Sequence, residues 1–86
     1  MPIQLTNRFV RQYGQLPQAT QRKVDKALSL LDIDFRYPGL RSHPIESAPR
    51  IFEAYVDIKY RMTFERHRDI FVMRNVDNHD ECLRNP

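Results

Sequence analysis

The sequence has 86 residues, which is the size of one small domain, so we expect a single domain over residues 1–86. Hydrophobic residues make up 41% and charged residues 29% of the chain, a balance that excludes an intrinsically disordered protein. The formal net charge is +3 at pH 7, and most of the basic residues are arginines. Because guanidinium groups match the geometry of phosphate oxygens, this charge permits a polyanionic partner without requiring one.

The cysteine count and the distribution of apolar residues exclude further classes. The single cysteine, Cys82, cannot form an internal disulfide or a multi-cysteine zinc site. Residues 1–10 contain polar side chains and no apolar signal-peptide core. The most apolar stretch, residues 24–35, is too short and too often interrupted by charges to cross a bilayer. We therefore expect a soluble, cytoplasmic protein with no membrane partner.

Residues 3–31 predict a short strand followed by a hairpin of two helices. Ile3–Leu5 is the expected strand, and Thr6 or Asn7 is the expected cap of the first helix. Pro17 is expected as the first residue of the second helix. Apolar residues recur at helical spacing, at Phe9, Val10, Tyr13 and Leu16 in the first helix and at Val24, Ala27, Leu28 and Leu31 in the second.

The second half of the chain predicts strands. Residues 32–49 contain three prolines and a glycine and should be mostly loop, with a brief strand at 40–43. From Ile51 the apolar period changes to two, which predicts strands over residues 51–58, 60–65 and 70–76, the last of them central. Short connections make them an antiparallel meander. The fold class is therefore α+β, with the N-terminal helical hairpin packed on one face of a small antiparallel sheet.

The alternation also predicts which side chains lie on the open face of the sheet. If Phe52, Ala54, Val56, Met62 and Phe64 face the helices, then Tyr55, Arg61 and Thr63 face away from them. A four-residue loop over 66–69 would pair Glu65 with Ile70, Thr63 with Val72, and Arg61 with Arg74. Two facing arginines repel, so this register makes sense if an anion or the carboxylates of a partner bind between them. A loop of odd length would destroy the register.

A polar cluster with a histidine, His79, follows the third strand of the meander. Functional groups commonly collect at the rim of a rigid sheet, and His43 in the proline-rich loop is expected to reach the same rim. A capping or solvated turn histidine is the alternative for His79, and a surface ion pair with Glu53 or Glu65 is the alternative for Arg61. A metal site built from residues 79–81 is disfavoured, because adjacent residues on an extended chain point in opposite directions.

The order of four sequence motifs resembles the RelE/ParE toxin superfamily of bacterial type II toxin–antitoxin systems, and most of all its YafQ- and HigB-like ribonuclease branches. The motifs follow the helical hairpin and are Leu40-Arg41-Ser42-His43-Pro44, Phe52-Glu53-Ala54-Tyr55-Val56, Tyr60-Arg61-Met62-Thr63-Phe64 and Val76-Asp77-Asn78-His79-Asp80. The resemblance implies an endoribonuclease that cleaves messenger RNA, usually on the ribosome, and is inhibited by a cognate antitoxin. It implies attack by the 2′-hydroxyl of the RNA, with no metal and no cofactor.

The resemblance also implies roles for individual residues. Arg61 matches the strand arginine at the scissile phosphate, with Arg74 as its partner. His79 matches the C-terminal histidine that transfers a proton, and His43 matches the loop histidine before the first long strand. Tyr55 occupies a position where it can stack on a base or donate a proton.

Further substrate contacts and alternative functions are implied by the same resemblance. Lys59 and Asp80 are the remaining candidate substrate contacts, since the lysine-rich set of the RelE branch is missing from this chain. The C-terminal catalytic tyrosine of several relatives is absent as well. The alternatives are a non-catalytic, ParE-like inhibitor of DNA gyrase and a decayed homologue that only binds an antitoxin.

Overall fold

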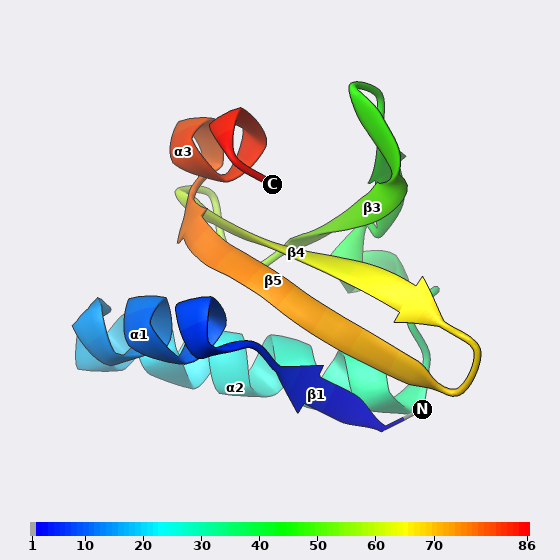
Figure 1. The fold of residues 1–86 in the computed structure, drawn as a ribbon. Coiled ribbons are helices and arrows are strands. Elements are labelled where there is room, and N and C mark those ends of the chain that lie inside the picture. Colours follow the sequence, from blue (N-terminus) through cyan, green and yellow to red (C-terminus); the bar gives the residue numbers. More distant parts are fainter. Residues whose placement is uncertain (1) are drawn as a thin grey trace.

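The computed structural model describes residues 2–86, which form one five-stranded sheet and its helices (Figure 1). The sheet order is β1-β5-β4-β3-β2. β1 is parallel to β5, and the other neighbours are antiparallel. The elements are β1 (Ile3–Leu5), α1 (Asn7–Gln15), α2 (Gln18–Ile33), the 3-10 helix η1 (Pro38–Leu40), β2 (His43–Ile45), β3 (Ala48–Tyr55), β4 (Tyr60–His67), β5 (Ile70–Asn78) and α3 (His79–Arg84).

The predicted α+β class is confirmed, with one difference in the sheet. Helices α1 and α2 lie along one face, and α3 lies over the opposite face (Figure 1). The meander β3-β4-β5 is antiparallel as predicted, but β1 adds a parallel edge strand and makes the sheet mixed. As a result β5 is an interior strand, and β4 takes the central position.

The N-terminal helices begin where the sequence places their caps. The side chain of Thr6 accepts a hydrogen bond from the backbone N–H of Phe9, 3.2 Å away, and so caps α1. Pro17 directly precedes α2 rather than forming its first residue. In α2 the predicted apolar stripe is buried at Val24, Ala27 and Leu31. No helix within residues 2–86 is long and apolar enough to span a membrane.

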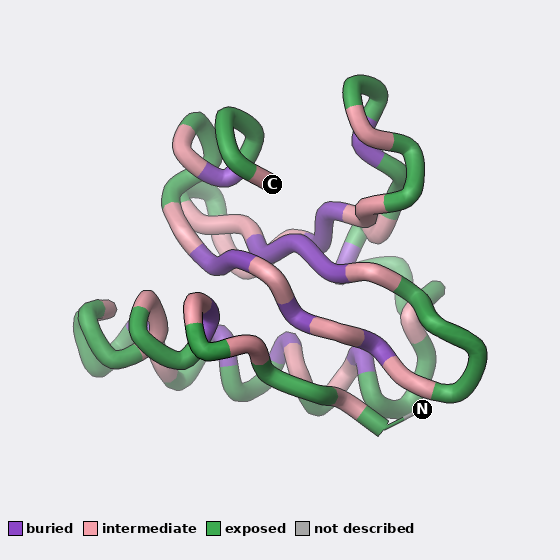
Figure 2. Tube along the Cα trace, in the orientation of Figure 1, coloured by how far each residue is buried: buried purple, intermediate pink, exposed green. Residues whose placement is uncertain are grey.

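The hydrophobic core lies between these helices and the sheet (Figure 2). Ala54, Met62 and Phe64 are buried on this face, as the alternation predicts, and Phe52 packs beside them. The ring of Phe64 stacks on Phe52 at a centroid distance of 5.6 Å and meets Phe71 edge-on at 5.3 Å. The aromatic cluster therefore fixes the helix-facing side of β3, β4 and β5.

The predicted pairing of Arg61 with Arg74 is wrong. His67 is the last residue of β4 and Ile70 is the first of β5, so the turn has two residues rather than four. Arg61 pairs with Asp77 instead. An opposite charge therefore stands where the sequence predicted a like charge.

A β-bulge explains the rest of the register difference. Thr63 pairs with Asn75 and Phe64 pairs with Met73, so Arg74 is the extra residue in β5. The predicted partner of Thr63 is wrong for both reasons, and that of Glu65 is wrong because of the turn alone, since Glu65 pairs with Val72. The bulge separates Arg74 from the alternation of its strand.

Two local predictions also fail. The brief strand expected at 40–43 is instead the end of η1 and the start of β2. The polar cluster after β5 is not extended, because it forms the helix α3. The side chain of Asn78 caps this helix by accepting a hydrogen bond from the backbone N–H of Glu81.

Candidate functional site

Six polar or aromatic side chains meet on the sheet face opposite α1 and α2. The hairpin of β2 and β3 rises from this face on one side and α3 on the other (Figure 1). Between them lies a pocket of about 180 Å3, lined by Arg41, His43, Glu53, Tyr55, Arg61 and His79. It continues into a groove of about 650 Å3 that shares His43, Glu53 and His79. The structure thus brings together four of the predicted site residues with two others, Arg41 and Glu53.

Glu53 is the buried acidic group of this pocket. Its residue is only 5% exposed, and it lies on β3, which is paired with β2 on one side and with β4 on the other. One carboxylate oxygen, Oε1, lies 3.6 Å from Nε2 of His43 and 4.0 Å from Nε of Arg61. The other, Oε2, is buried and has no hydrogen-bond partner among residues 2–86. Since a buried carboxylate is costly unless it is paired, Glu53 depends on the guanidinium of Arg61 at the pocket.

The imidazole of His43 is oriented by the backbone. Its Nδ1 lies 2.7 Å from the carbonyl oxygen of Arg41. A carbonyl oxygen only accepts hydrogen bonds, so Nδ1 carries a proton and donates it. Nε2 is then the atom that faces the pocket and Glu53. This is the arrangement of a base whose working nitrogen is held toward a substrate.

Arg41 lines the pocket and has an unusual backbone conformation. It has a φ of 49°, in the left-handed region, and it follows η1 directly. That conformation is uncommon for a residue with a Cβ and is often found at functional positions. Here it aims the carbonyl at His43 while the guanidinium lies over the ring of Tyr55, 4.8 Å from its centroid.

Arg61 is held rigidly at the edge of the pocket. Its Nη1 donates to the carbonyl oxygens of Asp57 and Tyr60, the second at 2.9 Å. Its guanidinium also lies 4.6 Å from the ring centroid of Tyr55. Tyr55 therefore stacks against two guanidinium groups, those of Arg41 and Arg61, and positions both.

His79 closes the pocket from the α3 side. It is the first residue of α3, and its backbone N–H donates to the carbonyl of Lys59 at 2.8 Å. The bond ties the helix to the turn between β3 and β4. The imidazole lines the pocket and the groove, and it is about half exposed, with Nδ1 4.0 Å from Asp80.

Three of the predicted site residues lie outside this pocket. Arg74 forms an ion pair with Glu65 and donates through Nε to the carbonyl of Pro86 at 3.1 Å. The exposed residues Lys59 and Asp80 lie beside His79 but do not line the pocket. The structure therefore does not bring Arg74 to Arg61.

The buried thiol of Cys82 lies beneath α3. Burial raises its pKa to about 12, so the thiol is protonated at neutral pH. Its Sγ donates to the carbonyl of Arg61 at 3.3 Å. Cys82 thus holds α3 on β4 and offers no reactive thiolate. Within residues 2–86, no three acidic, histidine or cysteine side chains are grouped so that they could hold a metal ion.

Arg41 and Glu53 were missed as site residues. Glu53 was considered only as an ion-pair partner of Arg61, and the 4.0 Å separation fits that contact. The period-two pattern does place Glu53 on the same face as Tyr55, so this signal was available. Nothing in the sequence marks the left-handed backbone of Arg41.

No family model and no curated protein matches the sequence. Solved structures match it over nearly the whole chain. YafQ from E. coli strain BL21(DE3) is 15% identical, with a TM-score of 0.75 over 93% of this chain and 94% of that one. The archaeal RelE–RelB complex from Pyrococcus horikoshii OT3 contains a chain that is 12% identical, with a TM-score of 0.74 over 90% and 92%. The YoeB/ParE toxin from Agrobacterium tumefaciens is 14% identical, with a TM-score of 0.69 over 92% and 99%. The protein has the fold of the RelE/ParE toxins.

Proposed function

We propose that this protein is the toxin of a type II toxin–antitoxin system and a metal-independent endoribonuclease. The observation that carries the proposal is the orientation of His43, whose Nδ1 is committed to the carbonyl of Arg41 while Nε2 faces the pocket. The buried carboxylate of Glu53 lies next to that nitrogen, and the fixed guanidinium of Arg61 lies beside Glu53. A fold shared with YafQ and RelE supports the same function.

The proposed reaction begins at the 2′-hydroxyl of the RNA. His43 Nε2 accepts the hydroxyl proton while the oxygen attacks the adjacent phosphorus, and the imidazolium that forms is stabilised by Glu53, 3.6 Å away. Arg61 stabilises the extra negative charge on the pentacoordinate phosphorus. The bond to the 5′-oxygen breaks, and that oxygen takes a proton from His79. The products are a 2′,3′-cyclic phosphate and a 5′-hydroxyl.

The other predicted residues take supporting roles in this proposal. Tyr55 stacks against Arg41 and Arg61, so we assign it to positioning these groups. Lys59 and Asp80 lie beside His79 at the outer edge of the site, where they contact the flanking RNA. Arg74 holds the C-terminal Pro86 over the sheet instead of touching the phosphate.

The proposed substrate is messenger RNA, cleaved on the ribosome, and the proposed protein partner is a cognate antitoxin. The net charge of +3 suits an RNA substrate. The structural neighbour from P. horikoshii is itself a complex of RelE with RelB, which supports a partner of this kind. A ParE-like gyrase inhibitor has no use for the arrangement of His43, Glu53 and His79, so the pocket favours the ribonuclease.

The test is cleavage of a messenger RNA with and without ribosomes, in the presence of EDTA. The wild type should cut and leave 2′,3′-cyclic phosphate ends. The variants His43→Gln and His79→Ala should each cut more slowly, by about a hundredfold or more. His67→Ala is the matched control, because His67 is as exposed as His43 but lies at the β4–β5 turn. Undiminished cleavage in both test variants contradicts the site. Absence of any cleavage by the wild type, together with inhibition of gyrase supercoiling, would identify the ParE-like function.

A further inference from the structure

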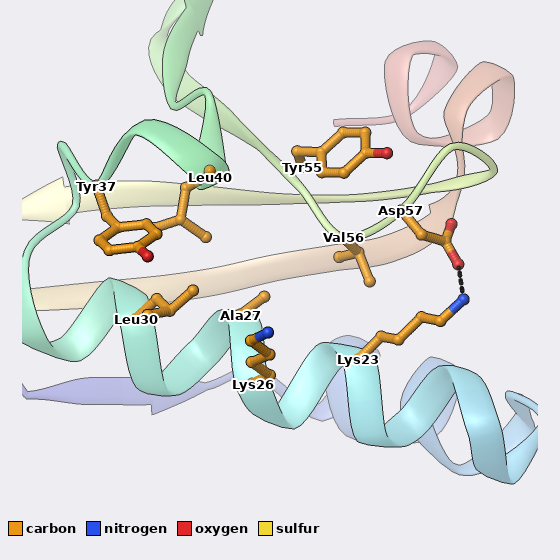
Figure 3. A pocket seen from close by; sticks show the side chains of 10 residues that line it. Lys23, Lys26, Ala27, Leu30, Tyr37, Leu40, Tyr55, Val56 and Asp57 are labelled. Carbon is orange, nitrogen blue, oxygen red and sulfur yellow. Dashed lines mark hydrogen bonds and ion pairs between the residues drawn. The ribbon is translucent and has the colours of Figure 1, made fainter.

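A second pocket, of about 480 Å3, lies on the other side of Tyr55 (Figure 3). It opens between α2, η1 and the end of β3. Its lining residues are Lys23, Lys26, Ala27, Leu30, Tyr37, Gly39, Leu40, Tyr55, Val56 and Asp57. Apart from Tyr55, none of these residues has a role in the reaction proposed above.

The interior of this pocket is apolar and flanked by two aromatic rings. Figure 3 shows Ala27 and Leu30 on α2 below it, with Tyr37 on one side and Tyr55 on the other. The ring of Tyr37 lies against Gly39, where a Cβ would approach a ring carbon to 3.1 Å. The glycine therefore gives this ring the room to lie along the wall. A flat, apolar ligand suits such a slot.

The rim of the pocket carries positive charge. Lys23 is paired with Asp57 at 3.2 Å (Figure 3). Burial acts to raise the pKa of Asp57, but hydrogen bonds from the backbone of Tyr60 and Lys59 and from Lys23 outweigh it and leave the pKa below its ordinary value. Asp57 is therefore ionised at neutral pH and neutralises Lys23. Lys26 is exposed and forms no ion pair within residues 2–86, so the rim has a net positive charge.

The two pockets adjoin at Tyr55. Tyr55 lines both of them, and Arg41 of the first pocket directly follows Leu40 of the second. A chain-like ligand whose phosphate lies at Arg61 can therefore continue around Tyr55 into the apolar slot. Single-stranded RNA alternates flat bases with negative phosphates, which matches an apolar interior beside a free ammonium group.

We propose that the second pocket binds the base of a nucleotide next to the scissile phosphate, with Lys26 contacting the phosphate of that nucleotide. The inference rests on the proposed ribonuclease function and adds a substrate subsite to it. The base packs against the rings of Tyr37 and Tyr55. The pocket thereby fixes which side of the catalytic site the RNA strand follows.

An abasic scan tests this subsite. The probe is a single-stranded RNA of about ten nucleotides with a 2′-deoxy substitution at the cleaved position, so that it binds without being cut. Removing the pocketed base should weaken binding to the wild type by roughly five- to a hundredfold. In Tyr37→Ala, removing the same base should change RNA affinity little, because this variant lacks the ring on which the base stacks. Lys26→Gln should weaken binding of the intact RNA and lower the slope of log affinity against log salt concentration by about one. Arg22→Gln on the same helix is the control, and both quantities should stay unchanged in it.

The outcomes separate the subsite from the catalytic function. An equal abasic penalty in the wild type and in Tyr37→Ala, with both proteins folded by circular dichroism, overturns the subsite. If Tyr37→Ala binds RNA normally but loses affinity for the antitoxin, the pocket holds a protein segment and the nucleotide assignment is wrong. If the wild type cleaves RNA and no abasic position matters, only the subsite fails. If it neither binds nor cleaves RNA, the proposed function fails with it.

Discussion

The two faces of the sheet are built from the same strands and have opposite characters. On the face covered by α1 and α2, the buried residues of β3 and β4 are apolar, namely Ala54, Met62 and Phe64. On the other face the buried residues of β3, β4 and β5 are polar, namely Glu53, Thr63 and Asn75. Because successive side chains of a strand alternate between the two faces, neighbouring residues in the sequence belong to the apolar core on one face and to the polar pocket side on the other.

The buried polar side chains of the second face differ in whether they have hydrogen-bond partners. Thr63 donates to the carbonyl of Pro86 at 2.8 Å. The amide of Asn75 donates to the carbonyls of Cys82 and Asn85 and accepts from Gln12. Glu53 keeps one buried oxygen that has no hydrogen-bond partner in the described part of the chain, residues 2–86. A buried polar group that lacks a partner calls for an explanation, and a role toward a substrate provides one at the pocket.

Phe64→Ala should have the largest effect and should act on stability. The ring is fully buried and contacts Phe52 and Phe71, so its removal leaves a cavity in the core. We expect the free energy of unfolding to fall by about 3–5 kcal/mol, measured by urea denaturation. If the loss is below about 1 kcal/mol, the helix-covered face is not the main source of stability.

Glu53→Gln should act on chemistry and leave stability nearly unchanged. Glutamine keeps the shape of the side chain but cannot stabilise the imidazolium that His43 forms in the proposed reaction. We expect cleavage to slow by about ten- to a hundredfold, while the midpoint of urea unfolding stays close to that of the wild type. A large fall in stability together with full cleavage per folded molecule would make Glu53 a structural residue.

Thr63→Val should have a smaller effect on the satisfied part of the polar face. The change removes the hydroxyl that donates to Pro86 and keeps the volume of the side chain. Pro86 still accepts from Arg74, so we expect a loss of about 1 kcal/mol in the free energy of unfolding. Cleavage should stay within about twofold of the wild type, since Thr63 does not line the pocket. A loss of cleavage without a loss of stability would show that the C-terminal residues contribute to the site.

The division into faces was predictable from the sequence, and the register was not. A period of two assigns Phe64 and Arg61 to opposite faces of the sheet, and this assignment does not depend on the register of the neighbouring strand. Both assignments are confirmed. Register depends on the length of the turn and on bulges. The turn after His67 has no Asn-Gly or similar signal, and the bulge at Arg74 leaves no mark in the pattern.

The candidate site was predictable in part for the same reason. His43 and His79 were expected at one rim, and the structure places both at one pocket. The helix α3 was missed because six residues give no apolar period, although Asn78 followed by Glu81 three residues later is a capping signal. The sequence also did not predict that β2 pairs with β3 at Glu53, because β2 begins at His43, after the left-handed turn at Arg41, rather than at residue 40.

Asp57→Asn should have the smallest effect, and a pH-dependent one, at the turn between β3 and β4 beside the second pocket. Burial opposes ionisation of Asp57, but the backbone N–H groups of Tyr60 and Lys59 and the ammonium of Lys23 lower its folded pKa below the reference of 3.8. A lowered folded pKa contributes stability above pH 3.8 and loses it as the pH falls through the folded value. Urea unfolding should therefore show the wild type more stable than the variant near neutral pH, with the difference shrinking below about pH 4. Asp69→Asn, at the exposed β4–β5 turn, is the control. A difference that stays constant down to about pH 2 would mean that the charge of Asp57 does not stabilise the turn.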